Sequence, residues 1–242
     1  MTLRELLEAE HACAPEGEVT ERRTSHGAEA RFDERVNDWN EDGDGVRVTT
    51  VNGTYTADRL ALTTGPWTSE TLKGLDLPLV VERQTVFWLD SGKSSSYDSS
   101  RFPIYAYEFK RGTICYGFPR LPRGVKASVM HDGVLHNHPS KIDREVHPSE
   151  VVPLRKALRP ILPALADAPL RDSTVCLFTN TPDHDFIIDF HPGFPQVLIS
   201  SPCSGHGFKF ASAIGEIQGD LLTTGKSAFD LSPFKIARFN AR

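Results

Sequence analysis

The chain has 242 residues, of which 39% are hydrophobic and 24% are charged, and its formal net charge is -5 at pH 7. These proportions are ordinary for a globular protein, and the length allows one large domain or two smaller ones. The charge gives no electrostatic basis for binding nucleic acid or an anionic membrane, and no apolar run approaches the roughly 20 residues that span a bilayer.

The beginning of the chain predicts a short helix and then a β-hairpin. Leucines fall on one face of a helix over residues 2–12, and the acids among them do not fit the apolar core of a signal peptide, so we expect a cytoplasmic protein. Further on, residues 47–51 and 54–58 flank Asn52-Gly53. That pair favours a tight turn because both residues tolerate positive φ, which predicts a hairpin.

Past the hairpin, short strands alternate with a few helices. The predicted strands are residues 60–65, 84–90, 104–110, 113–118, 124–130, 175–179, 186–190 and 197–200, and the predicted helices are residues 67–75, 148–165 and 208–224. Pro66 opens the first helix and Gly225 ends the last one. Pro153, Pro160 and Pro163 predict that the middle helix is short or kinked.

The cysteines give no pattern of a disulfide framework. They are Cys13, Cys115, Cys176 and Cys203. Because they are widely scattered and include no C-x-x-C pair, we expect free thiols in a reducing compartment.

A histidine-rich segment invites comparison with a metal site. Its histidines are His131, His136, His138 and His147. A His-x-His pair can be a fragment of such a site, but no carboxylate or cysteine stands at a convincing spacing. We therefore expect no metal there.

The most informative stretch is residues 204–209, Ser-Gly-His-Gly-Phe-Lys, which leads into an apolar helix. Before it come residues 176–181, Cys-Leu-Phe-Thr-Asn-Thr, and residues 185–192, Asp-Phe-Ile-Ile-Asp-Phe-His-Pro. Four earlier motifs precede these in order, at residues 52–58, 65–67, 83–84 and 116–119. Together they resemble the C-terminal part of the monomeric sarcosine oxidase and N-methyltryptophan oxidase family, over about residues 28–239. Several matches in the same order are far more specific than any one of them.

The resemblance implies an α/β plus antiparallel β fold (α+β), in which an incomplete Rossmann-like FAD-binding domain accompanies a substrate domain with an antiparallel or mixed sheet. It places residues 1–77 in the FAD-binding domain, residues 78–170 in the substrate domain, and residues 171–242 in the return to the FAD-binding domain. The implied substrate is an N-methyl amino acid or a related secondary amine. A hydride leaves its N-methyl carbon, water hydrolyses the resulting imine, and O2 is reduced to H2O2. The implied cofactor is FAD.

The resemblance also implies the residues that bind the cofactor. They are Cys176, Gly205, His206, Gly207 and Phe208. Cys176 corresponds to the cysteine that forms a thioether with the flavin 8α carbon, a bond that requires a thiolate at the benzenoid edge of the ring. Outside that motif, a strand cysteine is usually a small buried hydrophobe. The two glycines let the main chain approach closely, and N–H groups at the start of a helix stabilise negative charge at the pyrimidine end.

Three further residues correspond to the family's catalytic residues. Lys126 corresponds to the lysine over the other flavin face, where a preorganised cation stabilises transient superoxide; the alternative is an edge-strand lysine that discourages pairing. Lys209 corresponds to the lysine that helps to hold the substrate carboxylate. Tyr116 corresponds to a tyrosine of the substrate pocket, although an aromatic residue on a strand is more often part of the core. The family's histidine four residues after the first lysine falls on Met130 here.

The sequence departs from the family in one respect. The nucleotide-binding turn, G-x-G-x-x-G between a strand and a helix, is not found in it. The G-x-G instances are Gly43-Asp44-Gly45 and Gly205-His206-Gly207, and we expect neither to have the third glycine or the strand–turn–helix setting. The alternative function is therefore an inactive C-terminal fragment, or one half of a split flavoenzyme whose nucleotide-binding segment comes from a separate chain.

Overall fold

The structure of the protein is a computed structural model that describes residues 27–72 and 74–239. The helix predicted over residues 2–12 and Cys13 lie outside the described residues. The described part of the chain divides between Ala57 and Asp58 into two compact units. The domain boundaries expected after residues 77 and 170 stay predictions.

In the first unit, the described residues form a three-stranded antiparallel sheet. Its strands, in spatial order, are β1 (Val36–Asp42), β2 (Gly45–Thr50) and β3 (Thr54–Ala57). Trp39 and Val46 are its buried side chains, at 2% and 1% exposure. The hairpin predicted around Asn52-Gly53 is confirmed as β2 and β3.

The turn of this hairpin differs from the prediction. Thr49 and Thr54 are the last paired residues, so four residues lie between them, and neither Asn52 nor Gly53 has a positive φ. Instead, the Thr50 hydroxyl accepts hydrogen bonds of 3.1 Å from the backbone N–H groups of both Asn52 and Gly53. A side-chain oxygen thus orders the turn, as Ser and Thr often do in loops.

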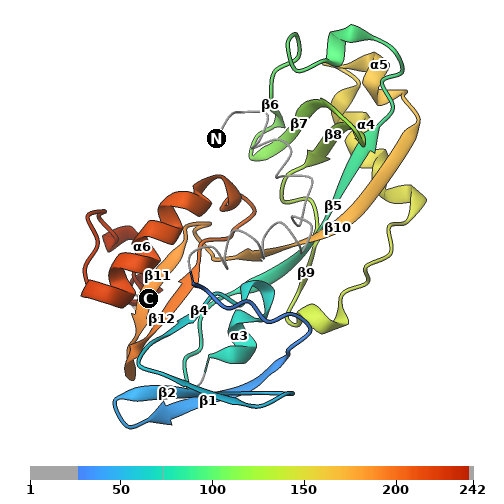
Figure 1. Cartoon of the computed structure of the whole chain (residues 1–242). Coiled ribbons are helices and arrows are strands. Elements are labelled where there is room, and N and C mark those ends of the chain that lie inside the picture. Colours follow the sequence, from blue (N-terminus) through green and yellow to red (C-terminus); the bar gives the residue numbers. More distant parts are fainter. Residues whose placement is uncertain (1–26, 73, 240–242) are drawn as a thin grey trace. The chain divides into compact units, whose positions relative to one another are not determined.

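The second unit contains a long antiparallel sheet in the order β10-β5-β8-β7-β6, with β9 also paired to β5. The strands are β5 (Val80–Leu89), β6 (Tyr105–Lys110), β7 (Thr113–Leu121), β8 (Gly124–Val129), β9 (Val134–His136) and β10 (Leu170–Asn180). The long strands β5 and β10 run side by side (Figure 1). The predicted strands in this region are confirmed, and β9 is an addition that the polar sequence around it did not indicate.

The sheet forks along one edge of β5. β8 pairs with Phe87–Leu89 and β9 pairs with Val81–Arg83, so neither strand pairs with residues 84–86. Side chains bridge this gap, because the Ser128 hydroxyl donates to the carbonyl of Thr85 at 2.7 Å and the Gln84 amide donates to the carbonyl of Val129 at 2.9 Å.

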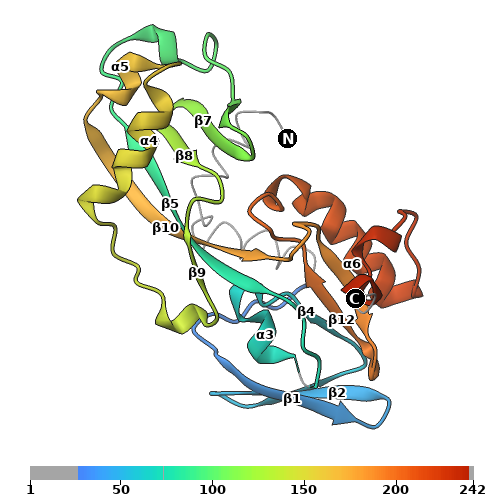
Figure 2. The ribbon, with the colours of Figure 1, turned by 180° about the vertical axis from the view of Figure 1, so that it is seen from behind.

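Helices cover one face of this sheet. The helix predicted over residues 148–165 is broken into η4 (Pro148–Glu150), α4 (Val151–Leu158) and α5 (Pro163–Ala166), as its prolines predicted. Figure 2 shows α4 lying over β8. The core between them is apolar and includes Phe87, Leu89, Val125, Ala127, Leu154, Leu158 and Leu165. Because side chains alternate along a strand, this core uses one face of the sheet and leaves the other for different chemistry.

A second sheet in this unit has the order β11-β12-β4, with β4 (Leu60–Leu62) parallel to β12 (Phe194–Ser201) and β11 (Ile187–His191) antiparallel to it. The helix α6 (Ala211–Thr224) packs its Ile214, Ile217 and Leu221 into a shared core with Ile188 and Leu198. Gly225, at φ 74°, ends the helix, as predicted. Helices with antiparallel and mixed sheets confirm the expected α+β class.

The remaining helices are short. Pro66 lies in η1 (Gly65–Trp67), and α3 (Thr68–Thr71) ends earlier than the predicted residue 75. The last predicted helix begins as η5 (Phe208–Phe210) before α6. The other 3-10 segments are η2 (Ser95–Tyr97), η3 (Pro139–Lys141), η6 (Ser232–Phe234) and η7 (Ile236–Phe239). Of the helices described, none has the length and apolar character needed to cross a membrane.

Candidate functional site

Lys126, Tyr116 and Cys176 share one face of the long sheet. Directly paired residues of antiparallel strands project to the same side, and alternate residues of a strand do so as well. Lys126 pairs with Trp88, Tyr116 pairs with Ser128, and Cys176 pairs with Gln84. Since Trp88 and Gln84 are four residues apart on β5, and Ser128 is two residues from Lys126 on β8, all of these side chains lie on the face opposite α4. The structure thus places three residues from three different strands on one face of the sheet.

Lys126 lies between aromatic rings on this face. Its Nζ is 4.9 Å from the centre of the Phe118 ring and 6.0 Å from that of Trp88. The Arg123 guanidinium lies 3.7 Å from the same Trp88 ring and is paired with Asp172 at 2.6 Å. Such contacts between a cation and a ring are attractive, and they hold both positive charges at the surface of the sheet.

The loop at residues 202–207, here called the glycine loop because it contains Gly205 and Gly207, packs against this face through Phe178. Ser204 donates its backbone N–H to the carbonyl of Thr179 at 2.9 Å, which fixes the loop beside β10. Gly205 has a φ of +75°, and a Cβ there would lie 2.6 Å from the Phe178 ring. At Gly207 a Cβ would lie 1.6 Å from the carbonyl oxygen of Pro202. Both positions therefore require glycine, because a neighbouring group lies too close for a side chain. Phe178 is on the same face as Cys176 because the two are two residues apart on β10.

The setting of this glycine pair corrects one prediction. Gly205-His206-Gly207 lies between the end of β12 at Ser201 and the start of η5 at Phe208, which is a strand–turn–helix arrangement. The expectation that it lacks this setting is wrong. The position of the third glycine is taken by Phe210, so the full nucleotide-binding motif is not formed here. Gly43-Asp44-Gly45, in contrast, lies at the turn between β1 and β2.

The other residues of the loop contact their neighbours. The His206 ring stacks on Phe186 with 5.0 Å between ring centres, and its Nε2 lies 3.0 Å from the carbonyl oxygen of His184. Lys209 is exposed and donates from Nζ to the carbonyl of His206 at 2.9 Å. Phe208 is 54% exposed. The Lys209 ammonium has three N–H donors, and this carbonyl uses one of them.

A buried carboxylate on the same face was not anticipated. Glu82 is only 2% exposed and accepts from His131 Nδ1 at 2.9 Å, Asn180 Nδ2 at 2.7 Å and the Gly133 N–H at 3.0 Å. Burial raises the pKa of the Glu82 carboxyl, but these three donors outweigh it, and the pKa lies below its usual value. The signal in the sequence was a glutamate within an apolar strand, because a fully buried carboxylate requires partners.

The described cysteines and histidines clarify the earlier expectations. Burial raises the pKa of the Cys115 thiol to about 11 and also raises that of Cys203, so neither thiol is poised as a nucleophile. Three of the histidines face carboxylates instead of one another: His131 faces Glu82, His138 faces Glu70 and His147 faces Asp143. Within residues 27–72 and 74–239, no group of three His, Cys, Asp or Glu side chains is arranged to hold a metal ion.

Comparisons with known proteins agree with this architecture. The family model described as "FAD dependent oxidoreductase" matches residues 19–221. The chain is 36% identical over 223 residues to monomeric sarcosine oxidase of Streptomyces avermitilis, and 34% identical over 199 residues to N-methyl-L-tryptophan oxidase of Shigella flexneri. These alignments cover 90% and 82% of this chain, but only 58% and 52% of the relatives. The chain thus spans somewhat more than half the length of these curated relatives.

Solved structures share the fold. NikD, described as an unusual amino acid oxidase essential for nikkomycin biosynthesis, superimposes with a TM-score of 0.72 at 24% identity, covering 88% of this chain and 56% of that one. L-proline dehydrogenase from P. horikoshii gives a TM-score of 0.76 at 18% identity, covering 90% and 56%. The chain therefore shares the fold of these two proteins over most of its length. By sequence, the chain belongs to the FAD dependent oxidoreductase family.

Proposed function

We propose that this chain provides the substrate-facing and ring-facing part of an FAD-dependent oxidase acting on N-methyl amino acids or related secondary amines. The observation that carries the proposal is the shared sheet face on which Cys176, Lys126 and Tyr116 lie, with the glycine loop packed against its Phe178. The relatives named sarcosine oxidase and N-methyl-L-tryptophan oxidase support this choice of substrate class.

The donor set on this face fits a flavin ring. The thiol would bond to the ring, the lysine ammonium would face it, and the loop with two glycines would lie against its edge. In addition, the buried Trp88 Nε1 has no hydrogen-bond partner among the described residues. Cys176 would hold the ring through its sulfur, and the main chain at residues 205–208 would approach its pyrimidine end. FAD, when bound, supplies the acceptor for the substrate hydride and passes the electrons to O2, giving H2O2.

The chain's own side chains would position the substrate. Lys209 would bind the substrate carboxylate through the N–H donors that the His206 carbonyl does not use, since its side chain is exposed and its stem is flexible. Tyr116, half-buried on β7, would line the pocket beside the N-methyl carbon. Loss of a hydride from that carbon and of the proton from the nitrogen gives an imine, which water then hydrolyses to the primary amine and formaldehyde. Lys126 would place positive charge where O2 gains its first electron.

A second candidate function is the alternative that the sequence left open, because these residues contain no G-x-G-x-x-G turn. The site could depend on a nucleotide-binding segment with G-x-G-x-x-G that a separate chain supplies, or it could be inactive. The first candidate predicts that FAD binds to the purified chain, whereas these alternatives predict that FAD alone does not bind to it. The domain limits at residues 1–77, 78–170 and 171–242, and a cytoplasmic location, belong to the same proposal.

The Cys176→Ser variant tests covalent attachment. The purified chain is incubated with FAD, precipitated with acid, and the visible spectrum of the redissolved pellet is recorded. We expect a flavin spectrum in the pellet of the parent protein and its loss from the Cys176→Ser pellet, because a hydroxyl cannot form the thioether. Cys203→Ser, which changes a thiol outside the proposed bond, keeps the colour.

The outcomes separate the candidates. Colour retained by Cys176→Ser contradicts attachment at this residue. A parent protein that stays colourless with FAD, but turns yellow when a separately produced G-x-G-x-x-G segment is added, supports the two-chain candidate. If it stays colourless in both cases, the chain is inactive.

Lys126→Met tests the role of the cation in the oxygen reaction. In protein that has bound flavin, we expect flavin reoxidation by O2 to slow by about 100-fold, because one preorganised charge is typically worth that much. Stopped-flow absorbance after anaerobic reduction measures the rate. Lys156→Met, an exposed lysine of α4 on the other side of the sheet, should leave the rate unchanged. Equal rates in the two variants would remove Lys126 from the mechanism.

A further inference from the structure

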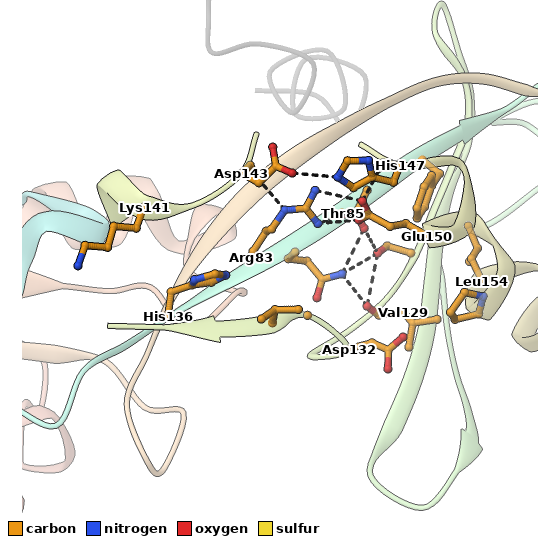
Figure 3. A pocket seen from close by; sticks show the side chains of 16 residues that line it. Arg83, Thr85, Val129, Asp132, His136, Lys141, Asp143, His147, Glu150 and Leu154 are labelled. Carbon is orange, nitrogen blue, oxygen red and sulfur yellow. Dashed lines mark hydrogen bonds and ion pairs between the residues drawn. The ribbon is translucent and has the colours of Figure 1, made fainter. Parts of the chain in front are cut away.

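A cavity of about 470 Å³ opens at the fork of the long sheet, between β8, β9 and the helical layer (Figure 3). Its apolar lining includes Phe87, Val129 and Leu154, and its polar lining includes Gln84 and Asp132. None of Lys126, Tyr116 and Cys176 lines it. Its volume is within the range of small-molecule sites, and its mixture of apolar walls and a few polar groups is typical of them.

Gln84 projects from the face opposite α4, but its amide lies in the fork between β5 and β8, where it lines the cavity and has an unsatisfied acceptor. Its Nε2 donates to the carbonyl oxygens of Val129 and Thr85, at 2.9 and 3.2 Å. Two carbonyl acceptors fix which end of the amide is the nitrogen, so the orientation of Oε1 is fixed as well. The residue is 3% exposed, and its Oε1 is buried without a hydrogen-bond partner among the described residues. A buried acceptor of this kind requires a donor, and the cavity is where a donor can reach it.

The charges that line the cavity are unevenly distributed around it. Arg83 is already committed, because it pairs with Glu150 at 2.6 Å and also donates to the carbonyls of Asp143 and Glu145. Asp132, by contrast, has no hydrogen bond or ion pair with another described residue. Lys141 and His136 lie together at the end of the cavity away from Asp132 (Figure 3). His136 Nε2 is buried without a partner in the described part of the chain, so it offers a further polar contact at that end.

We propose that this cavity binds a small organic ammonium ion, a primary or secondary amine with an apolar alkyl or arylalkyl body. One N–H of the ligand donates to Gln84 Oε1, the positive charge faces the Asp132 carboxylate, and the body lies against Phe87, Val129 and Leu154. A cation can face Asp132 and stay away from Lys141, because the two side chains lie at different ends of the cavity. Most of its walls belong to the helical side of the sheet, and Gln84 reaches it from the other face through the fork. The proposal does not depend on the proposed oxidase function.

Phenethylammonium is a suitable probe, and isothermal titration calorimetry on the full chain measures its binding. We expect saturable binding of one equivalent. N,N,N-trimethylphenethylammonium keeps the charge but has no N–H group, and 2-phenylethanol keeps the apolar body but has no charge. Both should bind at least tenfold more weakly, since a charge-assisted hydrogen bond accounts for about that factor or more.

Variants locate the site independently. Asp132→Asn, at an exposed position that does not threaten folding, should weaken phenethylammonium binding about tenfold, whereas Glu216→Gln, an exposed carboxylate of α6, should not change it. Gln84→Met should weaken it similarly, and Val134→Trp, which places an indole at the mouth, should abolish it. The proposal is overturned if phenethylammonium does not bind, if the trimethyl analogue binds equally well, or if Asp132→Asn and Val134→Trp bind like the parent.

Discussion

Gly207→Ala is expected to destabilise the protein by about 3 kcal/mol, because the added methyl group has no space. Its Cβ would lie 1.6 Å from the Pro202 carbonyl oxygen and 2.7 Å from the carbonyl carbon. Both atoms belong to the backbone, so neither can rotate away, and the loop at residues 202–207 must move. The midpoint of urea unfolding, followed by circular dichroism, measures the loss.

Gly219→Ala is the matched control for this substitution. Gly219 lies inside α6, and a Cβ there would meet nothing within 4 Å. Alanine has a higher helix propensity than glycine by about 1 kcal/mol, so this variant should be slightly more stable than the parent. If both variants have the same midpoint, the steric account of Gly207 is wrong.

Glu150→Gln is expected to cost about 2 kcal/mol at pH 7. Glu150 accepts from Arg83 at 2.6 and 3.1 Å, and from the Thr85 hydroxyl and the His147 N–H at 2.5 and 2.8 Å. The Arg83 side chain is 10% exposed, so removal of its counter-charge leaves a poorly solvated cation. The same substitution in a fully buried pair would cost more. Here the cost is smaller, because Glu150 is 21% exposed and Arg83 keeps its carbonyl partners.

The same pair makes stability depend on acid. Burial raises the pKa of Glu150, but Arg83, the His147 N–H and the Thr85 hydroxyl lower it to about 2. Because the folded pKa is lowered, the contribution is fully present above the unfolded value of about 4.3 and is lost as the pH falls towards 2. The difference in stability between parent and Glu150→Gln, measured by urea unfolding, should therefore shrink between pH 5 and pH 3.

The exposed pair Arg159–Asp167 provides the control for this prediction. Its side chains are 59% and 63% exposed, although their atoms approach to 2.6 Å. Solvent screens such a pair, so Asp167→Asn should cost less than about 0.5 kcal/mol and show little change with pH. A loss as large as that of Glu150→Gln would mean that burial does not decide the strength of these pairs.

Local patterns predicted much of the fold. Strands such as β7 and β8 could be predicted because apolar and β-branched residues alternate between turn residues, and Gly225 marked the end of α6 correctly. The turn at Asn52-Gly53 could not, since the Thr50 hydroxyl provides hydrogen bonds that compete with the expected geometry. β9 was missed because its three residues pair with β5 across a long stretch of sequence.

The candidate site was predicted from the resemblance more than from the pattern. Nothing local relates Cys176 to Lys126, because their common face depends on the register of β10 with β5 and of β5 with β8. Glu82 and His131 are 49 positions apart, and only the folded sheet brings them together. The cavity at the fork has the same origin, since it exists where two strands share one edge of a third.

The central position of β5 also has a consequence for biosynthesis. The strands that pair with one edge of β5 are β8 and β9, which are complete by His136. The strand on the other edge, β10, begins only at Leu170. Until the ribosome has released that segment, β5 has an open edge that can pair with other chains. Contacts between residues so distant in sequence also form slowly. The face that holds Cys176 is therefore among the last parts of the sheet to assemble, and a nascent chain that stalls before residue 170 is expected to aggregate.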